Sequence, residues 1–185
     1  RREVVMGNSY TRAVIYSPEG KVIGHGSGGN HAGPTAIAAV DIDGNGKGDV
    51  LVGDRNGQIG FTEFKGINDL TYQTGCEIAD IAAADLDGDG KLETVAVSKN
   101  FLVYVFDSER RPLRHRSLLT TCRDLVLGDV LGDPRPEIVC ACDDGSVRVL
   151  DSELRTRAVF TGGSRMRRVV LADLDGKGHL DVAAA

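Results

Sequence analysis

Four short acidic segments contain the side chains of this chain that could do chemistry. In each, Asp, Asn or Glu alternates with other residues around a glycine, at residues 41–49, 85–93, 129–137 and 173–181. A tight loop of this kind turns short carboxylates towards one point, and Ca²⁺ takes about six to eight oxygen ligands, backbone carbonyls included. The pattern therefore predicts structural Ca²⁺ sites. Mg²⁺ is less favoured because it prefers a smaller, well-hydrated octahedron.

The first two segments have a complete set of oxygen donors. The predicted metal ligands of the first are Asp41, Asp43, Asn45, the backbone carbonyl of Lys47 and Asp49. Those of the second are Asp85, Asp87, Asp89, the backbone carbonyl of Lys91 and Glu93. A bound ion would hold together the two strands that flank the loop and would not activate water. The alternative is that these side chains accept hydrogen bonds from nearby backbone amides and form turns without metal.

The last two segments depart from the pattern. Leu131 replaces a ligand in the third segment, and Pro134 and Pro136 stiffen its turn. In the fourth segment, Lys177 places an ammonium group where an oxygen ligand is needed. We therefore expect Ca²⁺ at the first two segments only.

The acidic segments recur with a fixed period. Their first residues, Asp41, Asp85, Asp129 and Asp173, are each 44 residues apart. A small apolar run precedes each segment and a second apolar run follows it, and turn signals and alternating runs complete the middle repeats. A period of about 40–45 residues is typical of a four-stranded propeller blade. A doubly wound α/β fold would need amphipathic helices between the strands, and we find none.

The sequence thus predicts an all-β fold: a β-propeller or propeller segment of about four four-stranded antiparallel blades. We expect residues 1–185 to form a single propeller unit, with strands a to d counted outwards in each blade. The predicted blades are 1–34 (strands b to d only), 35–78, 79–122, 123–165 and 166–185 (strands a and b only). Both partial blades contain a strand b, which favours a segment of a larger propeller. A closed four-bladed ring and an assembled oligomer are the alternatives.

The second acidic segment and its flanks resemble a known repeat. Residues 84–97 read A-D-L-D-G-D-G-K-L-E-T-V-A-V. This pattern resembles the FG-GAP/VCBS repeats, which form the blades of integrin α-chain heads, of many secreted bacterial proteins and of some ciliary-trafficking proteins. The resemblance implies a propeller that binds partners or carries an adjoining active domain, since a fold alone does not fix a function.

Charge is distributed unevenly along the chain. There are 22 Lys and Arg against 27 Asp and Glu, but 13 of the acidic residues lie in the four segments and leave 14 elsewhere. Twelve of the sixteen arginines lie between residues 110 and 168. They form either a solvated outer edge that prevents aggregation or a basic docking patch for an acidic protein or glycan. The candidate patch residues are Arg110, Arg111, Arg114, Arg116, Arg165, Arg167 and Arg168.

Several classes of function are disfavoured by composition. Trp is absent, and few aromatics accompany the arginines, which argues against a nucleic-acid platform. The chain has no apolar run of the roughly 18 residues that a membrane-spanning helix requires. The four histidines share no motif, and no catalytic constellation is present, so we expect no enzyme activity.

Four cysteines bear on the compartment. Cys140 and Cys142 share one face of a strand at a spacing too long for a disulfide within it, and a bridge between Cys76 and Cys122 stays open. Cysteines that alternate into a strand usually serve as small apolar residues, which favours a reducing compartment. Calcium loops favour an extracellular one, so the localisation is left open.

The function expected from these features is a non-catalytic protein-interaction or scaffolding propeller with calcium-binding loops. Its partners would be another protein, further copies of the chain or the remainder of a larger propeller. The main alternative is a calcium-stiffened carbohydrate-binding part of an extracellular carbohydrate-active or adhesion protein. A third reading is a kinase-like ATPase, because residues 6–14 and 20–24 resemble the phosphate-binding hairpin of sugar kinases. Met6 replaces the acidic residue usual there, and no later nucleotide motif follows.

Overall fold

The computed structural model describes residues 3–7, 13–25, 33–63 and 70–185, and the fold in them is all-β. These residues form seventeen strands in five antiparallel sheets. No helix that could cross a membrane occurs in this part of the chain. Residues 8–12 of the kinase-like hairpin and residues 26–32 of the glycine-rich segment, including His31, lie outside the described residues.

Within every sheet the strands follow one another in chain order. Sheet one contains β1 (Val4–Gly7), β2 (Ala13–Tyr16) and β3 (Val22–His25). Sheet two contains β4 (Pro34–Val40), β5 (Asp49–Asp54), β6 (Gln58–Glu63) and β7 (Leu70–Gln73). Sheet three contains β8 (Ile78–Ala84), β9 (Glu93–Ser98), β10 (Leu102–Phe106) and β11 (Pro112–Ser117). Sheet four contains β12 (Cys122–Gly128), β13 (Glu137–Cys142), β14 (Ser146–Leu150) and β15 (Thr156–Thr161), and sheet five contains β16 (Val169–Ala172) and β17 (Asp181–Ala184).

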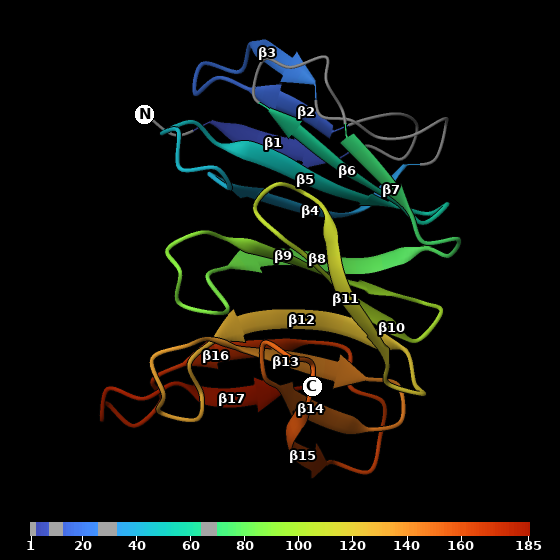
Figure 1. The fold of residues 1–185 in the computed structure, drawn as a ribbon, viewed down its shortest axis with the longest axis vertical. Helices are drawn as coiled ribbons and strands as arrows, with labels where there is room; N and C mark the ends of the chain where they lie inside the picture. The colour runs from blue at the N-terminus through green and yellow to red at the C-terminus, as the bar shows by residue number, and fades with distance from the viewer. Residues whose placement is uncertain (1–2, 8–12, 26–32, 64–69) are drawn as a thin grey trace.

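The sheets are stacked one after another, with their first strands side by side. Strand β4 contacts β8, β8 contacts β12, and β12 contacts β16. Figure 1 shows sheet one and sheet five towards opposite ends of this stack. Strands β4, β8, β12 and β16 therefore occupy the inner positions of successive propeller blades, and the array is open in the part of the chain that the structure describes.

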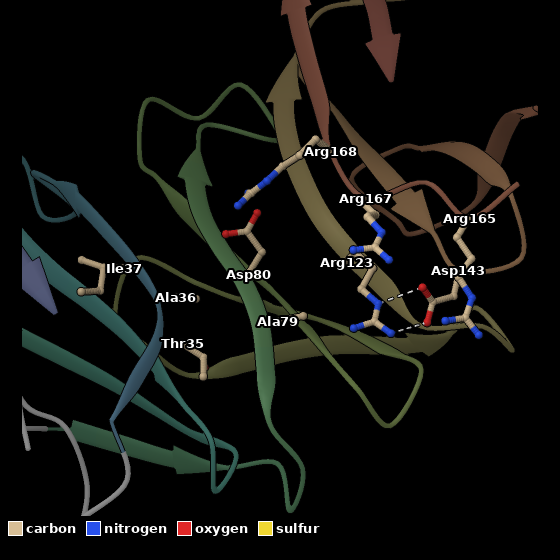
Figure 2. Close-up of a pocket in the computed structure, with 10 residues that line it drawn as sticks. All are labelled: Thr35, Ala36, Ile37, Ala79, Asp80, Arg123, Asp143, Arg165, Arg167 and Arg168. Carbon is tan, nitrogen blue, oxygen red and sulfur yellow. Dashed lines mark hydrogen bonds and ion pairs between the residues drawn. The ribbon is translucent and has the colours of Figure 1, made fainter. Parts of the chain in front are cut away.

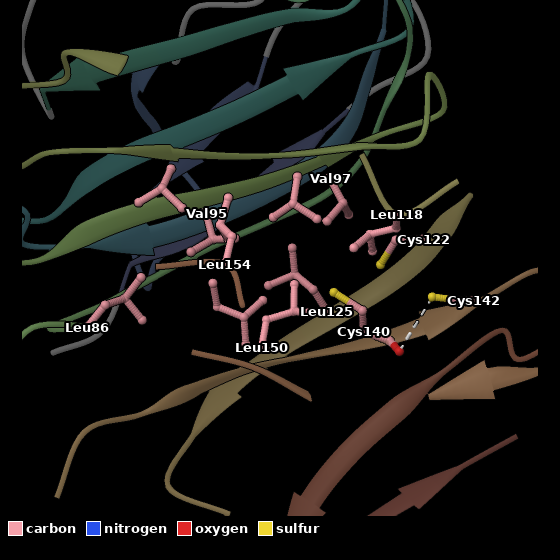
Figure 3. Close-up of a cluster of buried hydrophobic side chains, with 13 residues drawn as sticks. Leu86, Val95, Val97, Leu118, Cys122, Leu125, Cys140, Cys142, Leu150 and Leu154 are labelled. Carbon is pink, nitrogen blue, oxygen red and sulfur yellow. Dashed lines mark hydrogen bonds between the residues drawn. The ribbon is translucent and has the colours of Figure 1, made fainter. Parts of the chain in front are cut away.

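The hydrophobic core lies between successive sheets. In β9, Val95 and Val97 pack towards sheet four, whereas Ala96 packs towards sheet two. In β13, Cys140 joins the cluster between sheets three and four, and Val139 joins the cluster that faces sheet five. Figure 3 shows the cluster between sheets three and four. Because both faces of the central strands are buried, these strands appear in the sequence as continuous apolar runs.

Close approach of neighbouring sheets explains two of the glycines. A Cβ atom added at Gly53 would lie 2.4 Å from Cγ2 of Ile78, and one added at Gly128 would lie 2.6 Å from Cδ1 of Leu171. Real Cβ atoms do not come this close to other heavy atoms. A side chain at Gly53 would push the sheets apart because it meets the branched part of Ile78, whereas one at Gly128 would displace the end of the Leu171 side chain. Small residues near the inner strands are therefore a packing requirement.

Candidate functional site

The acidic segments form the loops that leave the inner strands. We number them along the chain as loop one (41–49), loop two (85–93), loop three (129–137) and loop four (173–181). Among the described residues, three loops bring carboxylate oxygens within 4.8 Å of one another: Asp41, Asp43 and Asp49 in loop one, Asp85, Asp87 and Glu93 in loop two, and Asp173, Asp175 and Asp181 in loop four. Clustered carboxylate oxygens are the donors that a hard cation such as Ca²⁺ prefers. The donor chemistry of loops one and two therefore fits this ion.

The fifth residue of each of these two loops makes a local hydrogen bond. Asn45 Oδ1 accepts the N–H of Lys47, and Asp89 Oδ1 accepts the N–H of Lys91, both at 2.8 Å. Asp89 does not belong to the carboxylate cluster of loop two. The roles of the Lys47 and Lys91 carbonyls as ligands stay predictions.

The ninth residue of every loop closes the loop with a hydrogen bond. Its carboxylate accepts a hydrogen bond from the backbone N–H seven residues earlier, so it closes the loop without a metal ion. The four bonds are Asp49 to Ile42 (3.0 Å), Glu93 to Leu86 (2.9 Å), Glu137 to Val130 (2.9 Å) and Asp181 to Leu174 (3.0 Å). Asp49, Glu93 and Glu137 are buried. The turn-forming role without metal is thus present in the structure. In loop one, both oxygens of Asp41 and of Asp43 also accept N–H groups, and Oδ1 of Asp49 pairs with Arg110. In loop two, the described hydrogen bonds leave Oδ2 of Asp87 and Oε1 of Glu93 for a cation.

The concentrated negative charge in loop two perturbs its buried member. Burial raises the pKa of Glu93, and the neighbouring carboxylates of Asp87, Asp89 and Asp85 raise it further, against the hydrogen bond from Leu86. A cation at this cluster would offset the repulsion.

Loops three and four differ from the first two, each in its own way. In the described residues, loop three contains no cluster of three carboxylates. Leu131 takes a ligand position and is 44% exposed. In loop four the carboxylates do converge, but Lys177 Nζ lies 2.6 Å from Oδ2 of Asp175. The ammonium group thus already neutralises part of the charge that would attract a cation.

At their other ends, the inner strands are linked by a half-buried and a buried aspartate that sequence reasoning missed. Asp80 of β8 accepts the N–H of Leu125 in β12 at 2.9 Å, and Asp124 of β12 accepts the N–H of Val169 in β16 at 2.8 Å. Asp124 also pairs with Arg168 at 2.7 Å. The 44-residue spacing of the two aspartates was the available signal, since it places them at the same position of successive repeats.

Burial changes the protonation of Asp80. Desolvation raises its pKa to about 6, and the charge of Asp124 acts in the same direction. Hydrogen bonds from the backbone of Leu125 and Ile81, together with the charge of Arg168, oppose the rise. Figure 2 shows the guanidinium group of Arg168 extending towards Asp80.

A pocket of about 480 Å³ lies at these strand ends and is lined by several arginines. We call it the arginine pocket; its lining residues are Thr35, Ala36, Ile37, Ala79, Asp80, Arg123, Asp143, Arg165, Arg167 and Arg168. They come from β4, β8, β12, the turn after β13 and the segment before β16 (Figure 2). Arg123 donates two hydrogen bonds to the carboxylate of Asp143, of 2.8 Å and 2.6 Å. In the part of the chain that the structure describes, the side chains of Arg165 and Arg167 make no hydrogen bond or ion pair.

The predicted basic patch is therefore divided between two roles. On the outer strand β11, Arg114 bonds to Ser152 and Glu153, and Arg116 bonds to the Leu154 carbonyl, so both join sheet three to sheet four. Arg110 reaches back to Asp49 of sheet two at 3.3 Å. These arginines hold neighbouring sheets together. In the arginine pocket, Arg168 likewise pairs with Asp124, whereas Arg165 and Arg167 are exposed.

The cysteines serve as small side chains in the hydrophobic packing. Cys122, Cys140 and Cys142 are buried in the cluster between sheets three and four, and Cys76 is half-buried (Figure 3). All four are free thiols, so the bridge between Cys76 and Cys122 that the sequence left open is not formed. Burial raises the pKa of the Cys122 thiol well above its usual value, which keeps it protonated and unreactive.

Comparison with known proteins gives matches at the level of structure. No family model and no curated protein sequence matches the chain. Two crystal structures of BBS1N in complex with ARL6DN, soaked with mercury or lead, superpose with TM-scores of 0.77 and 0.78 at 16% identity. They are matched over 98% of this chain and 52% or 53% of their own. The computationally designed Ika8 protein superposes with a TM-score of 0.75 at 15% identity, over 100% of this chain and 56% of its own.

The chain thus spans about half the length of these three solved structures. Likeness at this identity shows the fold alone. Together with the four-stranded antiparallel sheets and their adjoining inner strands, it establishes that the chain folds as a β-propeller segment of about four blades.

Proposed function

We propose that this chain is a non-catalytic protein-interaction segment of a β-propeller. The observation that carries the proposal is its likeness in fold, over 98% of its length, to BBS1N, which was solved in complex with a protein, ARL6DN. The chain's own surface is consistent with this role, because the arginine pocket presents charged side chains at the ends of the inner strands. Rigid blades that hold such a surface in place are well suited to partner binding.

We further propose that loops one and two bind structural Ca²⁺, as the resemblance to FG-GAP/VCBS repeats implies, and that the chain belongs to that superfamily. The proposed ligands are Asp41, Asp43, Asn45, Asp49 and the Lys47 carbonyl in loop one, and Asp85, Asp87, Asp89, Glu93 and the Lys91 carbonyl in loop two. Support comes from the convergence of three carboxylates in each loop. The ion would fix the connection between an inner strand and the next strand of its sheet.

Calorimetry with matched variants tests the calcium proposal. Asp85→Ala removes a carboxylate of the loop-two cluster, and Asp129→Ala makes the same change in loop three, where the described residues form no such cluster. Both aspartates accept a backbone N–H within their loops, so each variant is compared with its own melting temperature without Ca²⁺.

We expect Asp129→Ala to keep the full heat of Ca²⁺ binding and Asp85→Ala to lose about half of it, since two sites are proposed. For a site that binds only the folded state, Ca²⁺ at a hundred times its dissociation constant should stabilise the chain by about 2.7 kcal/mol. A flat titration and an unchanged melting temperature would contradict the proposal.

Reconstitution tests the interaction function. A protein that co-purifies with the chain would be produced separately and titrated into the pure chain by calorimetry. A stoichiometric complex is expected. Failure of every co-purifying protein to bind the pure chain would argue against an interaction module.

A further inference from the structure

We propose that the arginine pocket binds an acidic peptide segment of a protein partner, through the carboxylates of its Asp and Glu side chains. This inference rests on the proposed interaction function and adds to it the place of binding and the chemistry of the partner.

Four arginines and two aspartates line the pocket, which gives a surplus of positive charge. Arg123 forms an ion pair with Asp143. Arg168 forms one with Asp124, which lies just outside the lining. The guanidinium groups of Arg165 and Arg167 are left with their hydrogen-bonding capacity unused among the described residues. An acidic ligand can therefore gain bonds here without breaking an internal ion pair.

The pocket's own ion pair indicates which anion suits it. Arg123 holds the Asp143 carboxylate through Nε and Nη2, in the forked geometry that guanidinium and carboxylate groups form together. Arg165 and Arg167 lie close enough to Asp143 to lower its pKa, with Arg123 as the main cause. Carboxylates are thus already accommodated in this cluster of arginines.

A nucleotide fits the lining less well than an acidic peptide. The lining contains no aromatic side chain on which a nucleobase could stack. The volume of about 480 Å³ admits a few side chains of an extended segment.

The test is fluorescence anisotropy with the whole chain and a labelled peptide of alternating Glu and Ser. The control peptide has Gln in place of Glu. The test variant is Arg165→Glu with Arg167→Glu; both side chains are exposed and make no described bonds, so the fold should be kept. The matched control is Arg55→Glu with Arg157→Glu, which makes the same change in net charge at exposed positions outside the pocket lining and gives up only a 3.7 Å ion pair of Arg157 with Asp151.

We expect the Glu peptide, and not the Gln peptide, to bind, with an affinity that falls as salt is added. The pocket variant should bind about tenfold more weakly because it loses two guanidinium donors and gains two repelling charges, and the control variant should bind as the unchanged chain does. Equal binding by both variants, absence of peptide binding, or binding of pyrophosphate or heparin in place of the peptide would overturn the proposal. If the peptide fails but a reconstituted protein complex forms, only this inference is lost; if no protein complex forms, the interaction function fails as well.

Discussion

The carboxylate of Asp80 has two opposing effects on stability. It joins sheet three to sheet four by accepting the Leu125 N–H, but its pKa is raised to about 6, mainly by desolvation. A carboxyl group with a higher pKa in the folded state takes up a proton more readily there than in the unfolded chain. The contribution of Asp80 to stability should therefore fall as pH rises from about 4 to about 6 and stay reduced above that range.

Asp80→Asn should raise the free energy of unfolding near neutral pH. Its side-chain oxygen can still accept the Leu125 N–H. The bond that Asp80 accepts from the Ile81 N–H is lost, but the partly buried charge is removed. We expect a gain of about 1 kcal/mol, less than the full pKa shift implies, because the group keeps part of its hydration. Urea unfolding at about pH 5 and about pH 8 measures this. Asp124→Asn serves as the control: it keeps the bond to Val169 but loses the ion pair with Arg168, so a similar gain there would refute the explanation.

A second residue-scale test uses three equivalent turns. Gly57, Phe101 and Gly145 are 44 residues apart and have φ of 84°, 73° and 82°. A side chain is strained in this left-handed region, and Phe101 is 47% exposed, so it gains little from burial. Phe101→Gly should raise the free energy of unfolding by about 0.5–1 kcal/mol.

The reverse change, Gly145→Ala, should be destabilising. Its Cβ would lie 2.8 Å from the carbonyl oxygen of Ser164, in addition to the strain of the positive φ. Denaturant melts of both variants, fitted with a common slope, give the comparison. If both substitutions shifted stability in the same direction, the turn geometry would not be the cause.

At the scale of elements, each acidic loop connects an inner strand to the next strand of its sheet and is closed by its ninth residue. Glu137→Ala removes the buried acceptor of the Val130 and Leu131 amides. We expect a loss of about 1–3 kcal/mol, equal with Ca²⁺ and with a chelator, because loop three has no carboxylate cluster in the described residues. Thermal melts under both conditions measure it.

The control for this loop is Asp133→Ala. Asp133 makes one weaker backbone bond, to Arg135 at 3.2 Å. Its loss should cost much less than that of Glu137. A larger effect from Asp133, or a strong dependence on Ca²⁺ for either variant, would contradict the explanation that Glu137 closes the loop.

The elements were largely predictable from the sequence because the 44-residue period repeats the same strand signals. The all-β propeller class is confirmed. The period also places Asp80 and Asp124 at equivalent positions, but their bonds to the next sheet depend on how closely the sheets pack. The arginine pocket could be anticipated only in part: Arg165, Arg167 and Arg168 stood out as a basic group, while Arg123 lies on another strand and reaches the pocket through the arrangement of the sheets. The blade boundaries and the metal ligands stay predictions.

At the scale of the described molecule, the two ends of the inner strands differ in charge. The acidic loops follow the last residues of these strands, with Arg110, Arg135 and Arg155 among them, whereas the arginine pocket lies near the first residues. The chain's net charge of -5 does not reveal the positive surplus at the pocket. An acidic partner should accordingly approach the end of the strands that bears the pocket, where the field is favourable.

The terminal sheets leave apolar side chains exposed. Val4 and Met6 of sheet one are 50% and 57% exposed, and Val170 of sheet five is 57% exposed. Exposed apolar surface and unpaired strand edges favour association, as expected for a segment of a larger propeller. We expect light scattering to show species larger than one chain at high concentration, and Val4→Lys with Val170→Lys to reduce them. A monomer at every concentration would contradict this expectation.

The central claim is that this propeller segment binds a protein. The most direct test places a photo-crosslinking amino acid at position 167 in the arginine pocket and, separately, at position 157 on the outer strand β15, in chains expressed in their own cells. We expect position 167 to crosslink to a discrete partner protein and position 157 to give no such adduct. If neither position gives a protein adduct while the chain is folded, or if only position 157 does, binding at the pocket is contradicted.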